Sequence, residues 1–283
     1  MLSALRALSR AIPEDLAVKV MEFGETGGSG LLVISNLDLG SIPPTPQDLN
    51  DAEGSSNHCA VTVLAISRLL GHPVGYEPEF GGDLVQNVIP AKGGEYRQVS
   101  TSSKAELMFH TEAAFHPHQP RWLILLCLRG DEHAHTTYAT SRDVVNVLPE
   151  ATIRQLQLSE YRCGVDESYG DTKQLSERKP VIWGSKDCPR IWFDADLTVA
   201  TTIAGVAALS ELRDAISLVQ GKVTLRSGDL LILDNTLCVH GRSSFTPRFD
   251  GTDRWLQRCF VTSDLAPSDA ERQNRIITTT FNS

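Results

Sequence analysis

The feature that most constrains the fold of this chain is a His-Thr-Glu segment with another histidine far downstream. The segment holds His110 and Glu112 two residues apart, in a stretch that we expect to form a strand. Because side chains two apart in a strand point to the same face, the imidazole and the carboxylate are expected to project together. A third ligand is available from His240, 130 residues later. Two strands that meet across a barrel or sandwich would bring these residues together.

Two imidazoles and one carboxylate are the ligands of a facial triad, which holds non-haem Fe(II) and leaves positions open for dioxygen. A hydrolytic zinc motif is excluded, because it needs His-Glu-x-x-His on one helical turn. A lone His-x-Glu pair also arises by chance, so the interpretation depends on the rest of the chain. His116 and His118 flank a proline and are interpreted as surface or supporting residues.

The composition suits one large domain, residues 1–283, with 41% hydrophobic residues to form its core. A net charge of −9 without a basic cluster argues against nucleic acid as a partner. The longest apolar run, 122–128, is too short to cross a membrane. Six scattered cysteines without a Cys-x-x-Cys motif, and an N-terminus lacking the apolar run of a secretory signal, favour a cytoplasmic protein.

Hydrophobic periodicity predicts strands in both halves of the chain and helices around them. The polar segment 163–179 is expected to form a lid-like mobile loop over the site. This pattern favours a mainly β fold with flanking helices and a double-stranded β-helix core, the cupin-like jelly roll, over about 31–262. The expected helices are 13–23, 58–70, 144–158 and 204–219, and the expected strands are 31–34, 122–128, 222–225, 230–234, 237–240 and 254–262.

Two longer blocks of sequence carry a resemblance to a known family. The first is 109–117 with 126–129, and the second runs from 228 to 258 and includes Asp234-Asn235 and His240-Gly241-Arg242. Together they resemble the clavaminate synthase-like (TauD-type) branch of the Fe(II)/2-oxoglutarate-dependent oxygenases. That branch includes hydroxylases of free arginine, asparagine and lysine. The resemblance implies that His110, Glu112 and His240 bind Fe(II).

The resemblance also implies a site for the cosubstrate. Arg254 matches the arginine that binds 2-oxoglutarate, and a guanidinium can pair with both oxygens of its distal carboxylate. Arg258 matches the residue that holds the α-carboxylate of the amino-acid substrate. Both arginines are expected on one face of a strand, about 13 Å apart, although two solvated surface arginines are the alternative. A threonine helps to hold the cosubstrate in this family, and Thr136 is our first choice, with Thr137 as the alternative.

For the substrate, the family pattern implies Gln86 and Ser100 near the polar head of the amino acid, where Glu112 would also accept from the α-ammonium group. Asp194 and Asp196 lie where amino-acid hydroxylases place the acids that contact the substrate side chain. Two carboxylates suit a cationic or hydrogen-bond-donating side chain, such as that of arginine, lysine, citrulline or an asparagine-like molecule. A turn capped by an aspartate is the equally weighted alternative.

The expected reaction is hydroxylation of an unactivated C–H bond in a free amino acid or a metabolite derived from one. O2 would be consumed and 2-oxoglutarate converted to succinate. The reaction is expected to belong to the biosynthesis of a specialised metabolite such as an antibiotic. The carboxylate of Glu112 argues against halogenation, because related halogenases lack it and bind chloride there. Oxidative cyclisation or desaturation on the same iron site, and a non-catalytic metal-binding jelly-roll protein, are the alternatives. The sequence leaves open whether the substrate is carrier-bound and whether the chain forms a homodimer.

Overall fold

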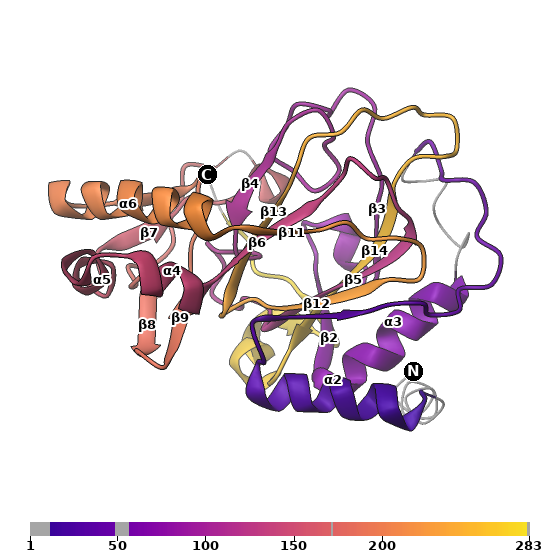
Figure 1. Cartoon of the computed structure of the whole chain (residues 1–283), viewed down its shortest axis with the longest axis horizontal. Coiled ribbons are helices and arrows are strands. Elements are labelled where there is room, and N and C mark those ends of the chain that lie inside the picture. Colours follow the sequence, from indigo (N-terminus) through magenta and orange to yellow (C-terminus); the bar gives the residue numbers. More distant parts are fainter. Residues whose placement is uncertain (1–11, 49–56, 171, 282–283) are drawn as a thin grey trace.

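Two β-sheets pack against each other with helices outside them (Figure 1), in a computed structural model that describes residues 12–48, 57–170 and 172–281. This arrangement confirms the expected mainly β fold with flanking helices around a jelly-roll core. The N-terminal segment considered for a secretory signal lies outside the described residues. Among those described, no helix has both the length and the apolar character needed to span a membrane.

The larger sheet forms one wall of the core and contains eight strands, in the order β1-β12-β5-β14-β2-β16-β15, with β3 also paired to β14. Neighbouring strands are antiparallel except for β16 and β2. Its strands are β1 (Leu31–Ile34), β2 (His72–Tyr76), β3 (Gln86–Val88), β5 (Trp122–Arg129), β12 (Leu230–Asp234), β14 (Trp255–Thr262), β15 (Arg272–Gln273) and β16 (Ile276–Ile277).

The smaller sheet forms the opposite wall, in the order β11-β6-β13-β4. β13 pairs with β4 in a register that sets His240 opposite His110. Two strand pairs, β7 with β10 and β8 with β9, lie outside the two sheets. The strands of the smaller sheet and of these pairs are β4 (Leu107–His110), β6 (Thr136–Thr140), β7 (Tyr161–Cys163), β8 (Ile182–Ser185), β9 (Cys188–Ile191), β10 (Thr198–Ala200), β11 (Gly221–Val223) and β13 (Cys238–Arg242).

Helices cover the outside of the larger sheet and the side of the smaller one (Figure 1). The even-numbered residues of β5 from Trp122 to Leu128 pack in a cluster with α2 and α3, while Leu123, Leu125 and Cys127 pack between the sheets. The apolar run 122–128 is therefore a strand buried on both faces, as the sequence predicted. The α-helices are α2 (Glu14–Thr26), α3 (Asn57–Leu70), α4 (Ser141–Val147), α5 (Glu150–Leu156) and α6 (Ile203–Val219), and the 3₁₀ helices are η2 (Phe80–Gly82), η3 (Glu167–Tyr169) and η4 (Ala266–Glu271).

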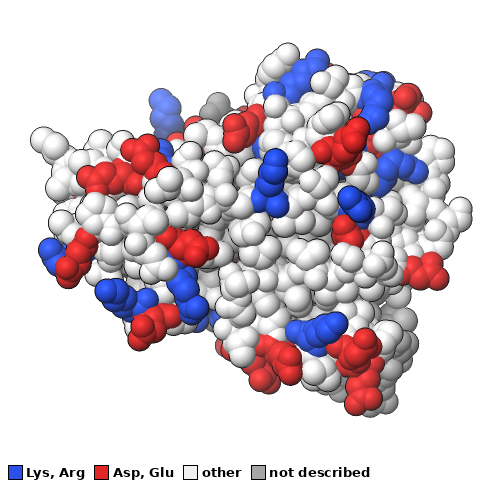
Figure 2. Space-filling view, viewed as in Figure 1, with Lys and Arg blue, Asp and Glu red and all other residues white. Residues whose placement is uncertain are grey.

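One expected helix, 144–158, is wrong in its continuity. The structure has α4 and α5 in its place, because Pro149 stands at the N-cap of α5 and cannot continue the hydrogen bonding of α4. The other expected helices and strands are present, with ends displaced by a few residues. Five of the six cysteines are buried and all six are unpaired, as expected for reduced thiols. On the face shown in Figure 2, charges of both signs are interspersed over the described residues.

We expect Gly241→Ala to destabilise the fold, because β13 approaches β4 closely at this residue. An added Cβ would lie 2.4 Å from the carbonyl oxygen of Leu107, a backbone atom that cannot move alone. The free energy of unfolding, measured by urea denaturation, should fall by about 1–3 kcal/mol. Gly94→Ala is the control, since its new Cβ would have 3.8 Å to the nearest atom, and its effect should stay within about 0.5 kcal/mol. Equal stability of the two variants would contradict the close approach of these strands.

Candidate active site

A cavity of about 310 Å³ lies between the two sheets. Its walls come from β5 and β14 of the larger sheet, from β4, β6 and β13 of the smaller one, and from the segment 163–179. Most of the residues predicted from the sequence line this cavity: Ser100, His110, Glu112, Thr136, Asp194, Asp196, His240, Arg254 and Arg258.

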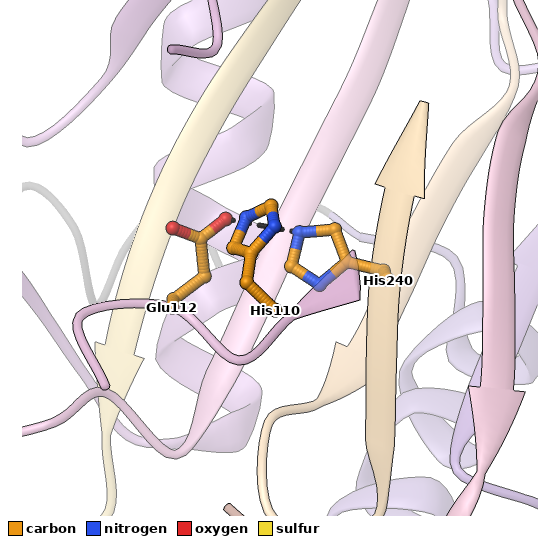
Figure 3. Close-up of side chains that lie close together, drawn as sticks. All are labelled: His110, Glu112 and His240. Carbon is orange, nitrogen blue, oxygen red and sulfur yellow. Dashed lines mark hydrogen bonds and ion pairs between the residues drawn. The ribbon is translucent and has the colours of Figure 1, made fainter. Parts of the chain in front are cut away.

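Figure 3 shows His110, Glu112 and His240 pointing toward one another, and one ligand atom from each lies within 4.8 Å of the others. His240 Nε2 is 3.1 Å from Glu112 Oε1. Two ligand atoms about 2.1 Å from a metal ion and at right angles to each other lie about 3.0 Å apart. The spacing of His240 and Glu112 therefore fits adjacent ligands of one ion.

The local geometry at Glu112 differs from the expectation. β4 ends at His110, and Glu112 stands in the loop that follows, so the prediction that both residues share a strand face is wrong. Beyond His110 the backbone leaves the ladder, and Ala113 has a positive φ of 49° that turns the chain. The carboxylate still reaches the imidazoles, but it does so from a loop (Figure 3).

Hydrogen bonding and electrostatics at the three side chains also suit a metal ion. His110 Nδ1 lies 2.8 Å from the carbonyl oxygen of Met108, to which it can only donate, and this contact orients the ring and leaves Nε2 as the nitrogen available to a metal ion. Burial, reinforced by His110, lowers the pKa of His240. Burial alone would raise the pKa of Glu112, but Arg258 and the two histidines outweigh it and bring that pKa to about 2. These shifts favour a charged Glu112 carboxylate and a neutral His240 imidazole, the forms that bind a metal ion.

Arg258 occupies the floor of the cavity among buried polar groups. Its Nε donates to Gln86 Oε1 at 2.8 Å, its Nη2 pairs with Glu79, and its Nη1 lies 3.7 Å from Glu112 Oε2. Burial would lower the pKa of Arg258, but the two carboxylates outweigh burial and raise it. Gln86 does not line the cavity itself but is hydrogen-bonded to Arg258, which does. Its direct role at the substrate stays a prediction.

Glu79 was not predicted from the sequence. It lies in the connection between β2 and η2, where no recognised motif or periodicity marks it. Its carboxylate also accepts a hydrogen bond of 3.4 Å from the hydroxyl of Tyr169, in the segment 163–179. Its place in the cavity wall and its pairing with Arg258 across the fold show that this acid belongs to the site.

Arg254 differs from Arg258 in its charge environment. It immediately precedes β14, lines the cavity and is 6% exposed, yet it forms no ion pair with any described carboxylate. Burial lowers the pKa of Arg254, although Cys127 and Asp131 are near enough to act in the opposite direction. A buried cation without a partner is costly, so this position fits an anionic ligand. Thr136 lines the same cavity, while the hydroxyl of Thr137 is buried without a partner beside Gly241, because adjacent strand residues face opposite sides. The geometry favours Thr136 over Thr137.

For the two aspartates the sequence left two interpretations open, a position beside the substrate and a turn capped by an aspartate. Asp194 has features of both. Asp194 lines the cavity, and its Oδ1 also accepts hydrogen bonds from the backbone N–H groups of Asp196 and Leu197 at 2.9 and 2.8 Å. It therefore caps a turn that faces the cavity. Asp196 lines the cavity too and is exposed.

The expectation for the local histidines was partly wrong. His116 is 1% exposed, and its ring packs edge-on against Tyr76 at a centroid distance of 4.9 Å, so it is a core residue rather than a surface one. His118 is partly buried and lies 3.3 Å from Glu271. Neither histidine lines the cavity.

Comparisons with known proteins agree with this geometry. The profile described as "Taurine catabolism dioxygenase TauD, TfdA family" matches residues 27–260. The chain is 36% identical over 252 residues to the L-asparagine oxygenase of Streptomyces coelicolor, covering 88% of this chain and 75% of that protein. It is 32% identical over 285 residues to the L-lysine 3-hydroxylase of Catenulispora acidiphila, covering 95% and 78%.

Solved structures give the same result. Asparagine oxygenase in complex with Fe(II), 2S,3S-3-hydroxyasparagine and succinate superimposes with a TM-score of 0.91 at 34% identity, covering 97% of this chain and 88% of that one. The non-heme iron oxygenase OrfP in complex with Fe and alpha-ketoglutaric acid superimposes with a TM-score of 0.88 at 31% identity, covering 96% and 90%.

We expect His240→Ala to weaken the binding of Fe(II) or Co(II), measured by anaerobic equilibrium dialysis. The loss should exceed the roughly 10- to 100-fold that removal of a supporting hydrogen bond costs, because a ligand itself is removed. His133→Ala is the control, since that side chain is 78% exposed and outside the cavity, and its metal affinity should be unchanged. Full affinity in His240→Ala would refute the assignment of this ligand.

Proposed function

Because this chain belongs to the TauD/TfdA family of dioxygenases, we propose that it hydroxylates a free amino acid, using Fe(II), 2-oxoglutarate and O2. One observation carries the proposal: two imidazoles and a carboxylate converge in a cavity that is also lined by Arg258, which is paired with acids, and by Arg254, which forms no ion pair with a described carboxylate. The triad suits a metal ion, the unpaired arginine suits a dianion, and the paired arginine suits a zwitterion.

His110, Glu112 and His240 would hold the iron. When bound with 2-oxoglutarate, the iron supplies the oxidation, in which one atom of O2 enters a C–H bond of the substrate and the other enters succinate as CO2 is lost. The side chains of the protein bind the reactants, orient them and keep water away from the cavity. Arg254 would pair with the distal carboxylate of 2-oxoglutarate, and the hydroxyl of Thr136 would donate to it.

Arg258 and its acidic neighbours suit the head group of an amino acid. Arg258 already contacts Glu79 and Glu112, so the three side chains together carry no excess positive charge for a lone anion. A zwitterion adds a carboxylate and an ammonium group at once and leaves the net charge of the cluster unchanged. We infer that Arg258 takes the α-carboxylate, while Glu79 and Glu112 accept hydrogen bonds from the α-ammonium group, with Ser100 on the same wall.

The cavity also has an acidic wall, which favours a cationic or hydrogen-bond-donating side chain. Asp166, Asp194 and Asp196 form this wall, and Arg97, which also lines the cavity, is already paired with Glu167 at 2.9 Å. Relatives of this chain carry names that fit such substrates: L-lysine 3-hydroxylase, L-ornithine/L-arginine 3-hydroxylase and enduracididine beta-hydroxylase. A role in specialised metabolism, such as antibiotic biosynthesis, is part of the proposal.

The organisation of the chain is also a proposal. We infer one oxygenase domain over residues 1–283, located in the cytoplasm, with the segment 163–179 as a lid. The contribution of Asp166, Ser168 and Tyr169 to the cavity wall supports the lid, because a movement of this segment would open the cavity. A small molecule is the proposed partner, rather than a nucleic acid or a membrane.

A screen of free amino acids, with anaerobically loaded Fe(II) and 2-oxoglutarate, tests the proposed reaction. We expect amino acids with basic or amide side chains to stimulate succinate release once O2 is admitted, because the acidic wall can bind their donors. Mass spectrometry should find a product heavier by one oxygen atom. A product that has only lost hydrogen would indicate desaturation or cyclisation, and the absence of stimulation by any amino acid would overturn the proposed substrate class.

Two arginine variants should separate the cosubstrate site from the substrate site. Arg254→Leu should raise the KM for 2-oxoglutarate, and Arg258→Leu should raise the KM for the amino acid, each by about 10- to 100-fold, because each loses a charge-assisted pair. Arg154→Leu, on the exposed surface of α5, is the control with unchanged constants. The assignment fails if both cavity variants change the same KM and leave the other unaltered.

A further inference from the structure

The loop that carries Glu112 receives hydrogen bonds from a residue remote in the sequence. Asn235, directly after β12, is 5% exposed. Its Oδ1 accepts from the backbone N–H of Glu112 at 2.7 Å, and its Nδ2 donates to the carbonyl oxygen of the same residue at 3.1 Å. Nδ2 also donates to the carbonyl oxygen of Pro120 at 3.0 Å. One side-chain amide thus satisfies both backbone groups of Glu112, as a neighbouring strand would.

This contact occurs where the sheet no longer holds the chain. β4 ends at His110, and the positive φ of Ala113 turns the loop, so Glu112 has no partner strand. A buried backbone carbonyl or N–H left unsatisfied costs about 1–3 kcal/mol. Gln119 gives the Glu112 carbonyl a second, longer bond of 3.3 Å. The position of Glu112 therefore depends mainly on Asn235.

Asn235 is itself held firmly. Its backbone N–H donates to the carbonyl oxygen of Arg121 at 2.9 Å. The preceding residue, Asp234, is fully buried and forms an ion pair of 2.7 Å with Arg121. These bonds fix Asn235 to the end of β12. The Asn235 amide therefore links the Glu112 loop to the larger sheet.

The carboxylate of Glu112 has two competing partners. Its Oε1 faces His240 Nε2 at 3.1 Å, and its Oε2 lies 3.7 Å from Arg258 Nη1. The direction of the carboxylate depends on the position of the Glu112 backbone between these two partners. The hydrogen bonds from Asn235 to both backbone groups of Glu112 restrict that position.

We propose that Asn235 is a positioning residue, which keeps the Glu112 carboxylate directed toward the metal and away from Arg258. An asparagine suits this task because its amide is both a donor and an acceptor, whereas the isosteric leucine is neither. The inference rests on the proposed function only through the metal ion, and it concerns metal affinity rather than the identity of the substrate.

Asn235→Leu tests the proposal through anaerobic titration of the full chain with Co(II), followed by its absorption spectrum. We expect the Kd for Co(II) to rise about 10- to 100-fold, which is typical for loss of a group that orients a ligand, and the ligand-field bands to change shape. Asn87→Leu is the matched control, because that asparagine accepts from Trp255 Nε1 at 2.9 Å and does not line the cavity. It should lower the free energy of unfolding while leaving the Kd within about twofold.

A folded Asn235→Leu protein with the Kd and spectrum of the wild type would overturn the proposal. Should that variant fail to fold, Gln119→Leu removes the weaker bond to the same carbonyl from a partly buried residue, and a smaller rise in Kd is expected. No rise in Gln119→Leu would then count against the proposal. A Co(II) affinity that depends on Asn235, in a protein that hydroxylates no amino acid, would refute the proposed substrate and uphold this inference.

Discussion

The pairing of β13 with β4 is the contact on which the rest of the site depends. It sets His240 opposite His110, with ring centroids 4.4 Å apart, although the two residues are remote in the sequence. Arg242, at the end of β13, stabilises this pairing by binding the segment that precedes β4. It donates to Ser102 Oγ at 2.8 Å and to the Ser103 carbonyl at 3.1 Å. Because a shift of one residue would turn each side chain to the opposite face, the register of these two strands decides whether the imidazoles meet.

The charges in the cavity divide it into regions with different ligand preferences. Arg258 lies against Glu79 and Glu112, while Arg254 forms no ion pair with a described carboxylate and has Asp131 as a more distant acidic neighbour. Buried ion pairs add little net stability, since desolvation offsets much of the attraction, so a function in binding explains their presence better than a function in folding. One region carries no excess positive charge and suits a zwitterion, and the other is positive and suits a dianion. The triad lines the same cavity, which allows both a zwitterion and a dianion to approach one metal ion.

The fold could be predicted where the hydrophobic pattern was long or continuous. The run 122–128 is a strand buried on both faces, and the helical spacing of 58–70 corresponds to α3. The helix expected at 144–158 is interrupted because the periodic pattern continues through Pro149, which the backbone cannot do. The carboxylate of Glu112 meets the two imidazoles as expected, but from a loop and not from a strand, because hydrogen bonds to Asn235, 123 residues away, shape this loop and leave no periodic signal in the sequence.

The sequence by itself determined the chemical types present, which are two histidines, a carboxylate and two arginines spaced as in a known family. It also determined that the run 122–128 would be a buried strand. Tertiary structure alone decided that Thr136 rather than Thr137 faces the cavity, that Gln86 reaches the site through Arg258, and that Glu79 belongs to it. The physical reason is the separation along the chain over which each effect acts. Propensity and periodicity act between residues a few positions apart, whereas the distances within the site are set by strand register and by hydrogen bonds between segments remote in the chain.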